Sequence, residues 1–232
     1  MQYINLVPGT RAALRATGGS SLDKTRFLAF VEAGHADNTA SVISDQSGHN
    51  NHFTQSVVAN QPVAATDAEG RAYLDFARSG DPKFLNMPLS SGQANYTFYL
   101  VLDVQDVTSE TYLVDSGSHT LLLGTGPGAG LYYSSLFGGR GDNVRLTPGL
   151  QLLTWRLHDT EGGRVLSNKQ LLYNGSYTQA NLTPGRFGLD FGNDYGGFRG
   201  KLYALAVAVG GDTADQQDAL AAYFKSKYGL PY

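Results

Sequence analysis

The chain has 232 residues, with 17 Lys and Arg against 20 Asp and Glu, a formal net charge of −3 and no Cys. This length suits one large all-β domain or two small ones, and the near-neutral charge lacks the basic footprint of a protein that binds nucleic acid or an anionic membrane. The absence of cysteine excludes a disulfide framework, a Cys-ligated zinc site and a thiol nucleophile, and no apolar run approaches the roughly 18–20 residues that span a bilayer.

The first 25 residues have the pattern of an arm rather than of a sheet strand. Pro8-Gly9 and the segment 18–21, which reads Gly-Gly-Ser-Ser, are chain breakers. The start also lacks the basic region followed by an apolar region that marks a secretory signal. We therefore predict an arm over residues 1–25, packed on its own domain or on a neighbouring subunit, in a protein made without a signal peptide.

Strand patterns dominate the chain from residue 26 to residue 209. The segment 96–104 is β-branched and aromatic with apolar residues on both faces, which is typical of a strand buried in a sandwich. Residues 150–158 alternate, with Trp155 among leucines on one face, so we expect Trp155 in the core rather than at a ligand. Several short strands punctuated by Gly and Pro predict an antiparallel β-sandwich.

Three details of this region predict local structure. Asn174-Gly175 ends an apolar run and is a strong signal for a hairpin turn. The sequence Leu-Thr-Pro-Gly occurs at 146–149 and again at 182–185, which we interpret as the same turn chemistry used twice before a strand. In the segment 198–209 the alternation predicts one face made of Lys201, Tyr203, Leu205 and Val207.

One helix is expected, at 213–228. Thr213 and Gln216 have the spacing of a capping box. An apolar stripe follows at helical spacing, made of Leu220, Tyr223, Phe224 and Tyr228. Gly229 and Pro231 then end the helix, so we expect it to pack its stripe against the sandwich.

The segment 42–55, V-I-S-D-Q-S-G-H-N-N-H-F-T-Q, followed by Gln61-Pro62, resembles the opening motif of concanavalin A-like (laminin G-like) jelly-roll domains. Four later segments are similar to further motifs of that family, in the same order: Gly70–Phe76, Leu172–Gly175, Phe198–Leu205 and Ala222–Leu230. The chain departs from the pattern at Ile43, where the family usually has Trp, and at Ala204, where it usually has an acidic residue. The resemblance implies a two-sheet antiparallel jelly roll over residues 26–232.

Glycoside hydrolysis, which many relatives of this fold perform, needs two carboxylates about 5–5.5 Å apart for retention and further apart for inversion. The clustered acidic strand of the laminarinase-type relatives is absent, and the four glutamates all fall in predicted turns or strand ends: Glu32, Glu69, Glu110 and Glu161. No Gly-x-Ser-x-Gly elbow is present. We therefore predict a protein that is not an enzyme.

Two groups of oxygen-bearing side chains could offer ligands to calcium: Asp190, Asn193 and Asp194, and Asp45, Asn50 and Asn51. The alternative, which we favour, is that Asp45, Ser47 and Asn50 hold their own loop by accepting backbone hydrogen bonds. His49 and His52 have a metal-like spacing but no third ligand in view. We therefore expect no cofactor and no metal.

Sugar recognition uses an aromatic platform together with amide and carboxylate hydrogen-bonding groups. Six side chains in two glycine-rich segments are the candidate ligand-binding residues: Tyr132, Tyr133, Phe137, Asn193, Asp194 and Tyr195. The same tyrosines could instead be buried or form a contact with another subunit.

The family implied by the resemblance includes lectins, glycosidases, adhesins and virion parts, so the fold alone does not select a function. We predict a non-catalytic structural or adhesive module, most consistent with a phage virion component such as a capsid decoration or tail-fibre-associated protein. Its partners would be other virion subunits, a cell-surface glycan or both, in a homo-oligomer or larger assembly, without nucleic acid and without membrane insertion. The alternatives are a free lectin-like carbohydrate-binding protein at the cell surface or outside the cell, and then a glycoside hydrolase or lyase.

Overall fold

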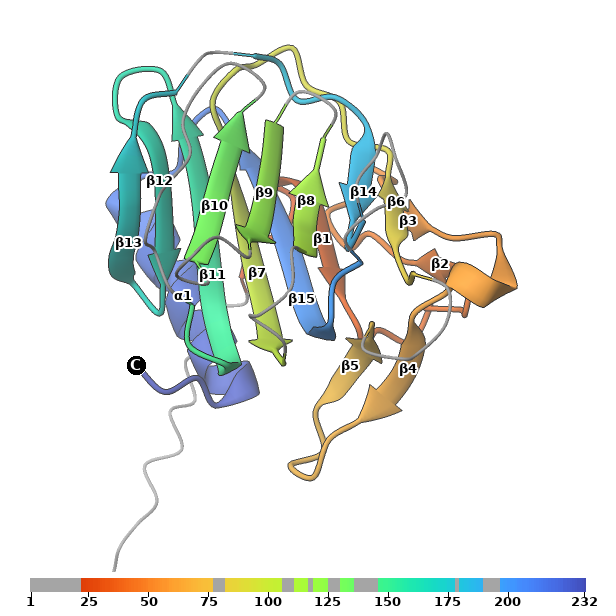
Figure 1. Ribbon diagram of the computed structural model, residues 1–232. Helices are drawn as coiled ribbons and strands as arrows, with labels where there is room; N and C mark the ends of the chain where they lie inside the picture. Colours follow the sequence, from red (N-terminus) through yellow and green to blue (C-terminus); the bar gives the residue numbers. More distant parts are fainter. Residues whose placement is uncertain are drawn as a thin grey trace, which may run out of the picture.

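The computed structural model describes residues 22–76, 82–105, 111–116, 119–124, 130–135, 146–177, 180–189 and 197–232. Within these ranges two antiparallel sheets pack face to face, and one α-helix follows at the C-terminal end (Figure 1). The predicted all-β sandwich with a C-terminal helix is therefore confirmed. Residues 1–21 of the predicted arm lie outside the described residues.

The larger sheet has eight strands in the order β13-β12-β11-β7-β15-β5-β4, with β1 also paired to β15. Its members are β1 (Phe27–Glu32), β4 (Val63–Thr66), β5 (Ala72–Asp75), β7 (Tyr96–Val104), β11 (Gly149–His158), β12 (Gly162–Ser167), β13 (Gln170–Gly175) and β15 (Gly200–Val209). The predicted strands at 96–104 and 150–158 are thus neighbours at the centre of this sheet.

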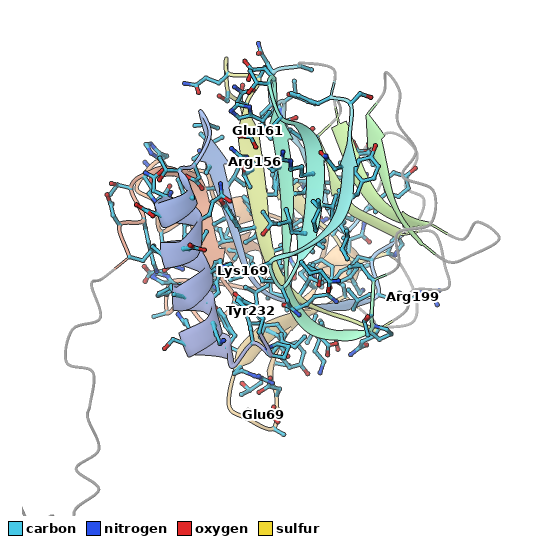
Figure 2. The ribbon with its side chains drawn as sticks, turned by 90° about the vertical axis from the view of Figure 1, so that its left-hand side faces the viewer. Glu69, Arg156, Glu161, Lys169, Arg199 and Tyr232 are labelled. Carbon is cyan, nitrogen blue, oxygen red and sulfur yellow. The ribbon has the colours of Figure 1, made fainter. Side chains whose placement is uncertain are left out.

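The smaller sheet has seven strands in the order β10-β9-β8-β14-β6-β3-β2. Its members are β2 (Val42–Ile43), β3 (Phe53–Thr54), β6 (Leu85–Met87), β8 (Thr111–Asp115), β9 (His119–Gly124), β10 (Gly130–Ser135) and β14 (Gly185–Phe187). A short 3-10 helix, η1 (Val58–Asn60), connects β3 to β4. Figure 2 shows the helix, the eight-stranded sheet and the seven-stranded sheet as three successive layers.

The core lies between the two sheets. Trp155 has no exposed surface and stacks on Phe98, with 5.3 Å between the ring centroids. Ile43, which stands where the family usually has Trp, belongs to the same buried cluster. The prediction that Trp155 is a core residue is confirmed, because alternating side chains of β11 point between the sheets.

A β-bulge in β15 changes the predicted alternation. The register against β7 shifts between Leu202 and Ala204. Leu205 therefore lies in the core between the sheets, whereas Tyr203 packs in the second cluster, under the helix. The prediction that Tyr203 and Leu205 share a face is wrong, because one extra residue in a strand reverses the faces of the residues that follow it.

The hairpin turn of this region does not lie at the predicted Asn174-Gly175 position. Asn174 and Gly175 belong to β13, where Asn174 is opposite Arg164 in β12. The turn is made instead by Asn168 and Lys169, with φ values of 48° and 69°. Positive φ at both central residues is what a two-residue hairpin of type I′ requires, and an Asn at the first position tolerates it. The Asn-Gly interpretation is therefore wrong.

The helix α1 (Ala214–Tyr228) begins and ends as predicted. The Thr213 side chain accepts a hydrogen bond from the backbone N–H of Gln216, and the Gln216 side chain accepts one from the backbone N–H of Thr213. Gly229 ends the helix with φ 66°. Phe224 is buried and stacks on Phe30 of β1, with 5.9 Å between the ring centroids. The helix thus covers the outer face of the eight-stranded sheet over β1, β15 and β7.

A buried carboxylate holds this helix on the sheet. Glu32, at the end of β1, is only 4% exposed. Its Oε1 accepts hydrogen bonds from Lys227 Nζ at 2.7 Å, Tyr223 OH at 2.9 Å and Tyr228 OH at 3.2 Å, and its Oε2 accepts one from Lys24 Nζ at 3.0 Å. Burial pushes the pKa of Glu32 up, but the two ammonium groups outweigh it and leave the pKa below its ordinary value. Lys24 thereby ties the last residues of the predicted arm to the chain's own domain.

Candidate functional site

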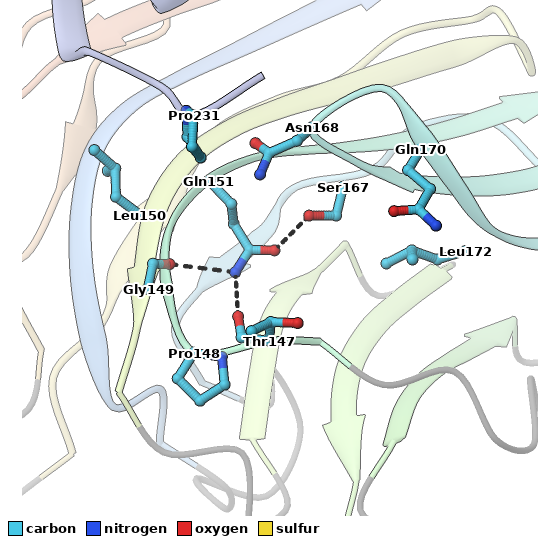
Figure 3. A pocket seen from close by; sticks show the side chains of 10 residues that line it. All are labelled: Thr147, Pro148, Gly149, Leu150, Gln151, Ser167, Asn168, Gln170, Leu172 and Pro231. Atoms are coloured by element: carbon cyan, nitrogen blue, oxygen red, sulfur yellow. Dashed lines mark hydrogen bonds between the residues drawn. The ribbon is translucent and has the colours of Figure 1, made fainter.

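A pocket of about 240 Å³ opens beside the turn between β12 and β13 (Figure 3). Its walls come from the start of β11, from the β12–β13 hairpin and from the C-terminal tail after α1. Ten residues line it: Thr147, Pro148, Gly149, Leu150, Gln151, Ser167, Asn168, Gln170, Leu172 and Pro231.

The pocket exists because β11 is longer than its neighbour β12. On one side β11 pairs with β7 from Gly149 onward, but on the other side it pairs with β12 only from Leu153 onward. Asn168 adds one step to that ladder: its backbone N–H donates to Leu152 O at 2.8 Å, and its Oδ1 accepts from Leu152 N at 2.9 Å. None of the described strands pairs with the first residues of β11 on this side, and the pocket lies in the space beside them.

Gln151 forms a rigid wall of this space. Its side chain is 3% exposed, and its Nε2 donates to Thr147 O at 2.9 Å and to Gly149 O at 3.3 Å. Its Oε1 accepts a hydrogen bond from Ser167 Oγ at 2.8 Å (Figure 3). Gly149 has φ 118°, a backbone conformation that favours glycine. One buried amide thus fixes the turn before β11 against β12.

The lining combines neutral hydrogen-bonding groups with apolar walls. Three amides and two hydroxyls are present, together with two leucines and two prolines, and none of the described lining residues carries an ionisable side chain. The nearest cation in sequence, Lys169 at the tip of the turn, does not line the pocket and instead pairs with Asp218 of α1 at 2.5 Å (Figure 2). The described part of the lining is therefore polar but uncharged.

A second cavity, of about 400 Å³, lies at the opposite edge of the sandwich, between β2, η1 and β4. Its apolar lining includes Ile43 and the 79%-exposed Val58. Two of its polar side chains already bond backbone atoms: Asn38 bonds Glu32 O, Ala33 O and Ser44 N, and Gln61 bonds Gln55 O. Since few hydrogen-bonding groups remain for a ligand there, the pocket beside Gln151 is the better candidate site.

Two of the six sequence-predicted ligand residues, Tyr132 and Tyr133, belong to described strands, and neither is among the described residues that line this pocket. Tyr132 and Tyr133 lie on β10, the edge strand of the seven-stranded sheet, opposite Leu122 and Leu121 of β9. The other four lie outside the described residues: Phe137, Asn193, Asp194 and Tyr195. The sequence did not reveal the pocket residues, because the two patterns that contain them predict turns rather than a binding site. These patterns are Leu-Thr-Pro-Gly at 146–149 and the Asn168-Lys169 pair. Neither says that the two turns come together.

The loop from 45 to 52 is held by the hydrogen bonds expected of an Asx turn. Asp45 Oδ1 accepts from the backbone N–H of Phe30 and of Ser47, each at 2.9 Å, and Oδ2 accepts from Ser47 Oγ at 2.7 Å and from Asn51 N at 3.0 Å. Four donors therefore occupy this carboxylate. Asn50 contributes its left-handed backbone, with φ 60°, rather than a side-chain bond, which corrects the role predicted for it.

The two histidines of this loop have separate local partners. His52 Nδ1 accepts from Asp45 N at 3.0 Å, and His49 Nε2 lies 3.1 Å from Thr25 O. Among the described residues no group of three or more His, Cys, Asp and Glu side chains is arranged to hold a metal ion. Asp190, Asn193 and Asp194 lie outside the described residues. In the part of the chain that the structure describes, no helix is long and apolar enough to cross a membrane.

No protein-family model matches the chain, and no curated protein matches it. Among solved structures it is similar to domain 4 of an extracellular arabinanase of Geobacillus stearothermophilus in complex with arabinotriose, with 15% identity, a TM-score of 0.60, and coverage of 84% of this chain and 98% of that domain. It is also similar to the binding domain of Paraclostridial Mosquitocidal Protein 1, with 14% identity, a TM-score of 0.57, and coverage of 88% of this chain and 52% of that one.

A third similar structure is the sialidase of Trypanosoma rangeli in complex with the inhibitor DANA, with 12% identity, a TM-score of 0.58, and coverage of 83% of this chain and 32% of that one. The chain thus spans nearly all of the arabinanase domain, about half of the toxin domain and about a third of the sialidase. At these identities the likeness shows a shared fold alone, that of a two-sheet antiparallel β-sandwich.

Proposed function

We propose that this protein is a non-catalytic module that binds carbohydrate. The observation that carries the proposal is the pocket beside Gln151, whose described walls offer neutral hydrogen-bonding groups and apolar surface and no ionisable side chain. Sugars present hydroxyl groups and C–H faces, so this mixture suits them. The shared fold with an arabinanase domain that binds arabinotriose supports the proposal.

The described glutamates support a binding role over hydrolysis. Glu32 is buried under α1, Glu69 pairs with Arg71 in the β4–β5 turn, and Glu161 pairs with Arg156 and Arg164. None of the three lines the pocket, and Glu110 lies outside the described residues. Among the described residues no aspartate or glutamate lines the candidate site, so the pair of carboxylates that glycoside hydrolysis requires is not found there.

A glycan screen tests this function. We expect the purified protein to bind at least one class of oligosaccharide or polysaccharide on a glycan array and in affinity electrophoresis, and to release no reducing sugar from the glycans it binds. Lack of binding to every glycan on the array and to a panel of plant, bacterial and host polysaccharides would contradict the proposal. Release of reducing ends would contradict its non-catalytic part.

We further propose, from the sequence resemblance to a family that includes virion parts, that the module is a decoration or tail-fibre-associated component of a phage particle. Its arm would then mediate assembly. Light scattering is expected to give a trimer or larger species for the full chain and a monomer after deletion of residues 1–20. A monomer in both forms would contradict the assembly role and favour a free lectin-like protein.

A further inference from the structure

We infer that the pocket beside the β12–β13 turn binds one uncharged sugar residue, which it holds through the backbone of Leu150 and the side-chain amides of Asn168 and Gln170. This inference rests on the proposed carbohydrate-binding function and assigns its site and its ligand class. It replaces the tyrosine-rich segments as the expected site.

The backbone of Leu150 faces the pocket. In an antiparallel ladder the N–H and C=O groups of a residue point to one neighbouring strand, and those of the next residue point to the other. Leu152 bonds Asn168 through both of its backbone groups, so it points away from β7. Leu150, two residues earlier, points the same way, into the space that lies beyond the turn. It offers one donor and one acceptor there.

This free strand edge is one residue long. Toward the C-terminal end, Asn168 already occupies both backbone groups of Leu152. Toward the N-terminal end, the next residue facing this side is Pro148, which has no N–H to donate. A peptide that adds a strand to an edge needs several successive backbone pairs. A single backbone N–H and C=O, as at Leu150, instead suits a small ligand with adjacent hydroxyl groups.

Two side chains add hydrogen-bonding capacity on the facing wall. Asn168 uses its Oδ1 on Leu152, and its Nδ2 has no partner among the described residues. The Gln170 amide at the start of β13 likewise makes no side-chain hydrogen bond within the described part of the chain. Figure 3 shows the amides of Asn168 and Gln170 on the β12–β13 hairpin beside this space. Together with Leu150, these groups provide donors and acceptors on two sides of the pocket.

The pocket lining disfavours a charged ligand, and the pocket volume disfavours a ligand longer than one sugar residue. A ligand carboxylate or ammonium would lose hydration here without meeting an opposite charge among the described lining residues, which is unfavourable. Leu172, Leu150, Pro148 and Pro231 provide apolar surface for the C–H face of a ring. A volume of about 240 Å³ is below the roughly 300–1,000 Å³ of pockets that enclose drug-sized ligands, so it suits one sugar residue with the rest of a chain outside.

The test uses two matched asparagines on one hairpin. Asn168→Asp keeps the Oδ1 acceptor for the backbone N–H of Leu152, and aspartate tolerates positive φ as asparagine does. The substitution replaces the Nδ2 donor by a negatively charged oxygen. Asn174→Asp makes the same change on β13 outside the pocket, where Oδ1 lies 3.4 Å from Arg164 Nε. With the tightest neutral oligosaccharide from the screen, calorimetry is expected to show about tenfold weaker binding for Asn168→Asp and unchanged binding for Asn174→Asp.

A second variant and a spectroscopic readout complete the experiment. Gln170→Ala changes an exposed side chain, so it tests the pocket even if Asn168→Asp is unstable. In ¹⁵N-labelled protein, titration with the same oligosaccharide is expected to shift the amide signal of Leu150. If the wild-type protein binds neutral glycans but both pocket variants bind as tightly, the site is wrong and the proposed function stands.

Two other results would overturn the inference in different ways. Exclusive binding of sialylated or uronic-acid glycans would overturn the uncharged ligand class while leaving carbohydrate binding intact. Absence of binding to any glycan by the wild-type protein would overturn the function and the site together. Melting temperatures of the two Asp variants, measured alongside, separate loss of fold from loss of binding.

Discussion

Replacing Trp155 by alanine is expected to lower the free energy of unfolding by about 3–5 kcal/mol. The indole has no exposed surface and stacks on Phe98 between the two sheets. Its removal would lose the transfer free energy of the largest buried side chain and leave a cavity that the rigid strands around it cannot close. Urea unfolding followed by circular dichroism measures the change, since the variant has no tryptophan left.

Leu171→Ala is the control for this prediction. Leu171 lies on the edge strand β13 and is 54% exposed, so its truncation is expected to change the free energy of unfolding by about 0.5 kcal/mol or less. A loss below about 1 kcal/mol for Trp155→Ala would contradict a close-packed interface between the sheets at this position. Because Trp155 does not line the pocket, we also expect Trp155→Phe to bind glycan as the wild-type protein does.

Replacing Glu32 by alanine is expected to lower the free energy of unfolding by about 2–4 kcal/mol. The carboxylate is the common acceptor for Lys24, Lys227, Tyr223 and Tyr228, so its loss would leave the buried Tyr228 hydroxyl poorly satisfied and loosen α1 from the sheet. The two lysines can still reach water, which keeps the loss below that of a fully buried ion pair. Urea unfolding monitored by Trp155 fluorescence measures it.

The pH dependence of this effect has a defined sign. The pKa of Glu32 is lower in the folded protein than in the unfolded chain, so the unfolded state binds more protons as the pH falls. The stabilisation by Glu32 is therefore complete above the unfolded pKa of about 4.3 and decreases as the pH falls through the lower, folded value. The stability difference between the wild-type protein and Glu32→Gln should shrink from pH 7 toward pH 3.

An exposed glutamate gives the matched comparison. Glu69 pairs with Arg71 in the β4–β5 turn, where its side chain is 64% exposed. Glu69→Gln is expected to change the free energy of unfolding by no more than about 0.5 kcal/mol at any pH in this range. A Glu32→Gln difference that is as large at pH 3 as at pH 7 would show that the carboxylate contributes through packing rather than through its charge.

The local elements were predictable from the sequence, because each depends on residues that are neighbours in the chain. The helix α1 follows from the Thr213–Gln216 capping box and from Gly229, both of which act within one or two turns. The buried position of Trp155 follows from strict alternation along a single strand. The Asp45 loop also follows, since an Asx turn satisfies donors that are close in sequence.

The errors arose where a second strand decided the outcome. Tyr203 and Leu205 were separated by a bulge, which is a mismatch in register between β15 and β7 and has no signature in β15 alone. The β12–β13 turn formed at Asn168-Lys169 rather than at Asn174-Gly175, because the pairing of the two strands determined which residues had to turn. The turn preference of two residues stabilises a hairpin less than the sum of its cross-strand side-chain pairs does.

The sequence by itself determined the all-β sandwich, its C-terminal helix and its near-neutral, cysteine-free composition. The tertiary structure alone decided where a ligand could bind. The candidate pocket exists because β11 extends past β12, and the buried Gln151 holds one turn against the other. A difference in length between two paired strands is a property of the sheet, so no motif within one segment could reveal it.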